Sequence, residues 1–144
     1  MLDATSNVEA QVTGLIGPNA ILQLSDPVET VLGPTVMAQV LHVCAVDLPK
    51  GDTMIPEQDV ALVHRTLRRL FPQDFRRISE LSGAATARYI RANRIPPLAR
   101  KALRMLPRIV AERLLTRAIL AHAWTICGSG SVAAHRRPNG VEFV

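Results

Sequence analysis

An imidazole, an indole and a thiol lie close together near the C-terminal end of the chain, at His122, Trp124 and Cys127, and a glycine- and serine-rich turn follows at residues 128–130. A neutral imidazole can bind a metal centre from one face, and an indole offers a flat apolar wall with one hydrogen-bond donor. The segment therefore predicts one border of a ligand pocket. The alternative, which the spacing alone favours, is that His122 is a helix C-terminal or core histidine and that Trp124 fills the core.

Two stripes of arginine lie upstream of this segment, the first of them beside Tyr89. Guanidinium groups bind carboxylates and phosphates through paired contacts. We therefore expect Arg91 and Arg94, with Tyr89, to contact a ligand that combines an apolar ring with carboxylate tails. The alternative is a solvated helix face, where such residues are usually found. The first stripe consists of Arg88, Arg91 and Arg94, and the second, if Pro107 does not interrupt its helix, of Arg100, Arg104 and Arg108.

Charge is distributed unevenly along the chain. Residues 1–60 carry eight acidic residues and one basic residue, whereas residues 88–117 carry nine basic residues and one acidic residue. A concentrated basic segment indicates an anionic partner, which can be nucleic acid, acidic lipid, a carboxylated ligand or the acidic half of the same chain. Nucleic acid is disfavoured, because single-strand binding needs aromatic platforms and the aromatic residues here fall mostly on apolar faces. We expect no nucleic-acid partner.

Most enzyme classes lack their signature in this sequence. The chain contains no G-x-G-x-x-G fingerprint, no phosphate-binding loop and no nucleophile elbow. Two cysteines, Cys44 and Cys127, are too few for a structural zinc or an iron–sulfur cluster. Their apolar neighbours predict reduced thiols in a cytoplasmic protein. We expect no catalytic residue, no metal site and no intrinsic cofactor.

The N-terminal sequence predicts neither secretion nor a membrane span. Asp3 and Glu9 lie where a secretory signal would carry positive charge. Every apolar stretch is interrupted well before the roughly 18 residues that a bilayer requires. The prediction is a cytoplasmic protein that is at most peripheral to a membrane.

The elements that position these residues are mainly helices. The chain has 144 residues, of which 48% are hydrophobic, and this predicts one predominantly helical α+β domain after a flexible tail over residues 1–13. The clearest amphipathic helix follows Pro56, where apolar side chains recur at helical spacing and predict an inner face. Residues 132–135 and 141–144 flank a turn at 138–140 and predict a β-hairpin. Helix boundaries are expected at Gly17, Gly33, Pro56, Phe71, Pro96 and Pro107, and the inner face at Val60, Val63, Leu67 and Leu70.

Four separated segments resemble, in order, the bacteriochlorophyll 4-vinyl reductase (BchJ) family. They are residues 17–24, residues 54–57 with Val63 and His64, residues 89–96, and residues 122–124 leading into 128–130. The resemblance extends over about residues 14–144. It implies a helical N-terminal part followed by the start of a small α/β ligand-binding domain of the 4-vinyl reductase type. Family members continue beyond the position of Val144, so we expect a truncated or diverged domain that lacks the usual C-terminal part.

The resemblance implies a protein of bacteriochlorophyll biosynthesis that binds a tetrapyrrole, of the Mg-protoporphyrin or divinyl protochlorophyllide type, and presents it to other enzymes of that pathway. A first alternative is reduction of the ring vinyl group with an external electron donor, since such chemistry is carried by cofactors. A second is an interaction module whose basic helical face docks on an acidic partner or a membrane. Formation of a homo-oligomer is left open. The expected ligand-binding residues are Tyr89, Arg91, Arg94, His122, Trp124 and Cys127.

Overall fold

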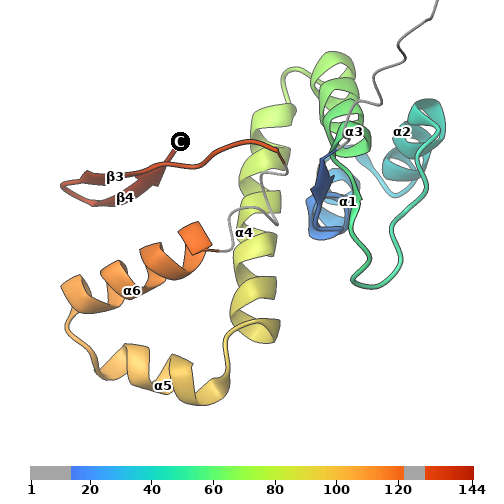
Figure 1. The fold of residues 1–144 in the computed structure, drawn as a ribbon. Helices are drawn as coiled ribbons and strands as arrows, with labels where there is room; N and C mark the ends of the chain where they lie inside the picture. Colours follow the sequence, from blue (N-terminus) through green and yellow to red (C-terminus); the bar gives the residue numbers. More distant parts are fainter. Residues whose placement is uncertain (1–13, 122–128) are drawn as a thin grey trace, which may run out of the picture.

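The computed structural model describes residues 14–121 and 129–144, so the expected tail over residues 1–13 lies outside the described part. The described residues form six helices and two small antiparallel sheets, which confirms the predominantly helical α+β fold (Figure 1). In chain order the elements are β1 (Leu15–Ile16), α1 (Asn19–Leu32), α2 (Val36–Cys44), β2 (Ile55–Pro56), α3 (Glu57–Leu70), α4 (Phe75–Asn93), α5 (Pro97–Met105), α6 (Arg108–Ala121), β3 (Ala134–Arg137) and β4 (Gly140–Phe143).

The hydrophobic core is formed by α1, α2, α3 and the first turns of α4. Ile21 and Leu24 of α1, Leu67 of α3 and Ile78 of α4 are completely buried. Among the described residues, every buried hydrophobic side chain lies between Ile16 and Ile78. Figure 1 shows these four helices gathered together, whereas the lower part of α4 extends away toward α5.

The inner face of α3 agrees with its sequence pattern at three of four positions. Val60, Val63 and Leu67 are buried, but Leu70 is 49% exposed, so its predicted core position is wrong. Leu70 is the last residue of the helix, and the next residue, Phe71, packs against the core in its place. Thr66 completes the buried face, where its hydroxyl oxygen accepts a hydrogen bond from the Cys44 thiol at 3.4 Å. Cys44 is therefore a free, buried thiol, as its apolar neighbours predicted.

The first sheet joins the chain just before α1 to the chain just before α3. Strand β1 pairs with β2 in antiparallel register, with Leu15 opposite Pro56 and Ile16 opposite Ile55. The Glu57 amide donates to the Gly14 carbonyl at 2.9 Å and extends this pairing by one hydrogen bond. The chain preceding α1 is thereby fixed to the start of α3.

The second sheet is the predicted β-hairpin. Strand β3 pairs with β4, and the closing pair, Arg137 with Gly140, encloses a two-residue loop of Pro138 and Asn139. Gly140 has φ +151°, a conformation that side-chain-bearing residues rarely adopt. An isolated hairpin is only marginally stable in water, and here β4 lies against α6.

Candidate ligand-binding site

Three of the six predicted ligand-binding residues lie at the C-terminal end of α4, with Tyr89 and Arg91 on its last turns and Arg94 as the residue that follows it. Tyr89 is half-buried, whereas Arg91 and Arg94 are exposed to solvent. The other three, His122, Trp124 and Cys127, lie outside the described residues. The described part of the expected site is therefore the C-terminal end of α4 and whatever packs beside it.

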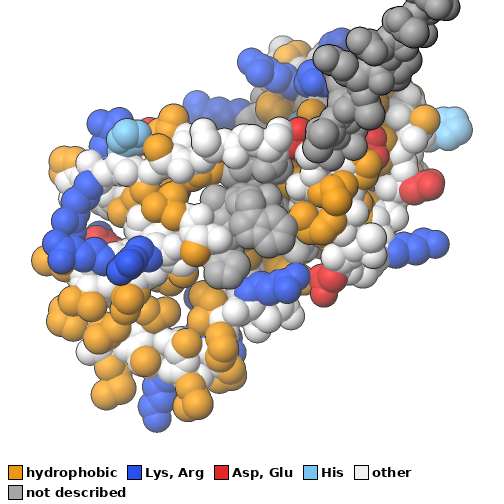
Figure 2. Space-filling view, in the orientation of Figure 1, with side chains coloured by type: hydrophobic (Ala, Val, Ile, Leu, Met, Phe, Trp, Pro, Cys, Tyr) orange, Lys and Arg blue, Asp and Glu red, His pale blue; other side chains and the backbone are white. Residues whose placement is uncertain are grey.

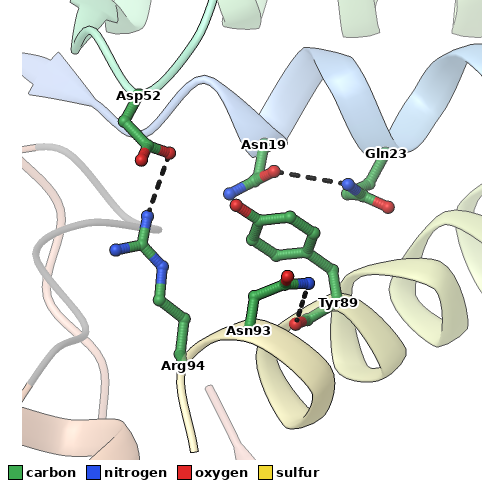
Figure 3. A network of polar contacts seen from close by, with 6 residues as sticks. All are labelled: Asn19, Gln23, Asp52, Tyr89, Asn93 and Arg94. Atoms are coloured by element: carbon green, nitrogen blue, oxygen red, sulfur yellow. Dashed lines mark hydrogen bonds and ion pairs between the residues drawn. The ribbon is translucent and has the colours of Figure 1, made fainter.

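The end of α4 faces the start of α1 and the loop before α3 (Figure 3). The Tyr89 hydroxyl points toward Asn19, the first residue of α1, whose side-chain oxygen accepts a hydrogen bond from Gln23 at 3.3 Å. The side-chain amide of Asn93 donates a hydrogen bond to the backbone carbonyl of Tyr89 at 3.0 Å. The Tyr89 side chain thus lies where the end of α4 meets the start of α1, beside the polar side chain of Asn19.

The two arginines of this end differ in their surroundings. The Arg94 guanidinium forms an ion pair with Asp52 at 3.2 Å, and the side chains are 56% and 74% exposed. This pair joins the basic and acidic halves of the chain, so Arg94 would have to exchange Asp52 for a ligand carboxylate. Arg91 has no ion-pair partner in the part of the chain that the structure describes. It is the arginine that a carboxylate can reach without breaking an existing contact.

A second cluster surrounds His64 on α3. The His64 Nε2 atom lies 3.3 Å from the Ala20 carbonyl oxygen of α1. The imidazole also makes an edge-to-face contact with Phe75, with ring centroids 6.5 Å apart and an interplanar angle of 87°. A depression of about 390 Å³ adjoins this cluster. It is lined by Ile16, Glu57, Gln58, Val60, Ala61, His64 and Arg65.

Glu57 of α3 binds the chain at Ser129, ahead of the β-hairpin. Its two carboxylate oxygens accept hydrogen bonds from the Ser129 amide and the Ser129 hydroxyl, both at 2.6 Å. These hydrogen bonds lower the pKa of the Glu57 carboxyl below its ordinary value. Glu57 is also the first residue of α3, where the helix dipole favours a negative charge. The carboxylate is therefore held ionised at neutral pH.

Gly14 is packed directly against this anchor. A Cβ atom added at Gly14 would lie 2.6 Å from the carboxyl carbon of Glu57. That distance is far inside van der Waals contact, and the carboxylate would have to move. A side chain at position 14 would therefore require the Glu57 carboxylate, the end of a flexible side chain, to shift from its present position.

The contacts bring together all four segments on which the sequence resemblance rests. Asn19 and Tyr89 join the first and third segments, His64 and Ala20 join the second and first, and Ser129 and Glu57 join the fourth and second. The sequence predicted Tyr89 and Arg94 as ligand-binding residues. It did not predict a role for Glu57, His64, Asn19 or Ser129. Their positions within the four segments were the available signal.

The contacts around Glu57 and His64 fix the positions of chain segments that are far apart in sequence. Each oxygen of the Glu57 carboxylate accepts one hydrogen bond from Ser129. The described residues contain no cluster of three or more His, Cys, Asp or Glu side chains that would hold a metal ion. Among the described residues, Tyr89 is half-buried beside Asn19, Arg91 has no ion-pair partner, and Ser129 is bound to Glu57.

Comparison with known proteins gives two similar sequences. The chain is 44% identical over 116 residues to a protein of Cereibacter sphaeroides named bacteriochlorophyll synthase 23 kDa chain, and 42% identical over 116 residues to a protein of the same name from Rhodobacter capsulatus. The aligned region is 80% of this chain but only 56% and 54% of those proteins. Neither name refers to a vinyl reductase. No family model and no solved structure matches the chain.

Proposed function

We propose that this chain acts in bacteriochlorophyll biosynthesis, together with other proteins of that pathway. The observation that carries this proposal is its similarity, at 44% and 42% identity, to two proteins named as the 23 kDa chain of bacteriochlorophyll synthase. The chain spans little more than half the length of those relatives. The proposal therefore concerns only the region that this chain shares with those relatives.

Within that role we propose that the chain binds a tetrapyrrole intermediate and presents it to a partner enzyme. A Mg-tetrapyrrole has a flat apolar ring, carboxylate groups at its edge and a metal that accepts an axial ligand. Tyr89 and Arg91 supply a ring surface and a guanidinium from one helix end. His122 and Trp124 supply an imidazole and an indole in a segment whose following residue, Ser129, is anchored to Glu57.

The alternative is reduction of a vinyl group on the tetrapyrrole with electrons from an external donor. We favour binding over reduction, because the groups at the end of α4 are the half-buried Tyr89 ring and the Arg91 guanidinium, which can contact a ligand but do not supply electrons. Incubation of the purified chain with divinyl substrate and either reduced ferredoxin or NADPH tests this alternative. Monovinyl product would establish it, whereas bound but unchanged substrate supports the carrier role.

A ligand titration tests the proposed site. We expect Mg-protoporphyrin to bind with a shift of its Soret band, and His122→Ala to weaken binding of Mg-protoporphyrin more than binding of metal-free protoporphyrin, because only the former uses an axial ligand. His42→Ala, at an exposed position of α2, is the matched control and should change neither affinity. Equal weakening of both ligands by His122→Ala would show that the imidazole does not bind the metal.

A further inference from the structure

The helices α5 and α6 expose many large hydrophobic side chains. No residue of either helix is buried. On α5, Leu98 is 82% exposed and Met105 is 79% exposed. On α6 the exposed large hydrophobic residues are Ile109, Val110, Leu114, Leu115, Ile119 and Leu120. Contiguous exposed apolar surface of this kind marks a site of interaction.

The apolar residues of α5 lie on one face. Leu98, Ala102 and Met105 are spaced four and three residues apart and therefore share a side of the helix. Ala99 and Leu103, on the adjacent side, are partly covered. The basic residues Arg100, Lys101 and Arg104 occupy the remaining arc. The helix is thus amphipathic, and its most apolar edge points to solvent.

Helix α6 differs because apolar residues surround it. A soluble helix that is hydrophobic on all sides is normally enclosed by protein, yet α6 contacts β4 and none of its residues is buried. Figure 2 shows hydrophobic side chains gathered over the lower left of the molecule, where Figure 1 places α5 and α6. We call the exposed side chains of α5 and α6 the α5–α6 surface.

The charge of the α5–α6 surface is strongly positive. Residues 97–121 contain six basic residues and one acidic residue, Glu112, which pairs with Arg108 at 2.7 Å. The other five have no ion-pair partner among the described residues. They are Arg100, Lys101, Arg104, Arg113 and Arg117.

We propose that the α5–α6 surface docks on a membrane that contains anionic lipid, with α5 lying in the plane of the interface. Helices that bind in this way combine an exposed apolar edge with Lys and Arg on the polar face. Long basic side chains can cover apolar surface with their methylene stems while their charges reach lipid phosphates. No helix in the described part of the chain is long and apolar enough to cross a bilayer. The contact would be superficial, and it adds a membrane surface to the partners of the proposed tetrapyrrole carrier.

Vesicle flotation with the whole chain tests this proposal. We expect binding to vesicles of phosphatidylcholine mixed with phosphatidylglycerol, little binding to pure phosphatidylcholine, and weaker binding at high salt. The double variant Leu98→Gln/Met105→Gln should lower the partition coefficient by about tenfold or more, because it removes the apolar edge. Lys101→Glu/Arg104→Glu should lower it on the order of tenfold or more for anionic vesicles.

Matched variants on α2 and α3 distinguish binding through the α5–α6 surface from nonspecific adsorption to vesicles. Val43→Gln/Leu70→Gln makes the same change at positions that are 65% and 49% exposed, and Arg68→Glu/Arg69→Glu makes the same charge change on α3. Both should leave vesicle binding unchanged. Equal binding by wild type and Leu98→Gln/Met105→Gln would overturn the proposal. Concentration-dependent dimerisation without vesicle binding would also overturn it and would identify a second copy of the chain as the occupant.

Discussion

Glu57 joins two parts of the chain that are 72 residues apart in sequence. Its carboxylate binds the amide and hydroxyl of Ser129, and its own amide binds the Gly14 carbonyl. One residue therefore connects the start of α3, the strand before α1 and the chain that enters the hairpin. Ser129 directly follows residues 122–128 in the sequence. Those residues include three of the expected ligand-binding residues.

The contact between Glu57 and Ser129 should respond to acid. Hydrogen bonds from Ser129 lower the pKa of the Glu57 carboxyl below its ordinary value of 4.5. The stabilisation is therefore fully present above that value and is lost as the pH falls through the lower pKa of the folded protein. A nuclear magnetic resonance titration of the Ser129 amide should show a midpoint below 4.5.

Three variants make that titration specific. Glu57→Gln should abolish the transition of the Ser129 amide, whereas Glu80→Gln, which removes an exposed carboxylate of α4, should leave it in place. Gly14→Ala should raise the midpoint toward the ordinary value, because the added methyl displaces the carboxylate. A midpoint at or above 4.5 in the unaltered protein would show that the anchor does not form in solution.

Local patterns explain which of these residues the sequence revealed. Arg91 and Arg94 were visible because arginines at helical spacing suggest a common face, and Tyr89 lies beside them. Glu57 gave no such signal, since an acidic residue at the start of a helix is common for reasons of capping and dipole alone. Its partner is too distant in sequence for a spacing rule to find. The pairing of Arg94 with Asp52 was foreseeable only as a general attraction between the two halves of the chain.

At the level of elements, boundaries were predicted well where the backbone is restricted. Gly33 ends α1 with φ 111°, Pro56 precedes α3, and Pro96 precedes α5. Such residues act through their own φ values and hydrogen-bonding capacity, so no tertiary information is needed. The pairing of β1 with β2 was missed, because each strand has only two residues and shows no alternation. Leu70 was misplaced because its helix ends there and Phe71 packs on the core.

The fully buried contact of α4 with the core lies in its first turns. Ile78 is fully buried and is the one described residue of α4 in the core cluster. Ile78→Ala should reduce the free energy of unfolding by about 2–5 kcal/mol, because it removes buried methyl groups and leaves a cavity. Leu98→Ala, at a position 82% exposed on α5, should change it by less than about 0.5 kcal/mol. Urea denaturation of both variants measures the difference, and equal effects would contradict the placement of the core.

The whole molecule has two regions of different character. Residues 16–78 contain the buried core, whereas α5 and α6 expose apolar and basic side chains. The sequence indicated this division through its charge, with acidic residues concentrated before residue 60 and basic residues after residue 88. It did not indicate how little of α5 and α6 would be covered, since amphipathic periodicity gives the apolar face and not its partner. The end of α4, with Tyr89 and Arg91, lies between the two regions.

Titration of this chain with a Mg-tetrapyrrole is the most direct test of the proposed carrier role. Mg-protoporphyrin should bind saturably, with one ligand per chain and a shifted Soret band. Arg91→Ala should weaken binding about tenfold by removing a charged contact to the ligand carboxylate. Leu98→Gln/Met105→Gln should leave the affinity unchanged, because the apolar edge of α5 is not part of the site. A spectrum identical to that of free pigment would contradict the proposed binding of a tetrapyrrole. Binding lost only in the Leu98→Gln/Met105→Gln variant would contradict the proposed site at the end of α4.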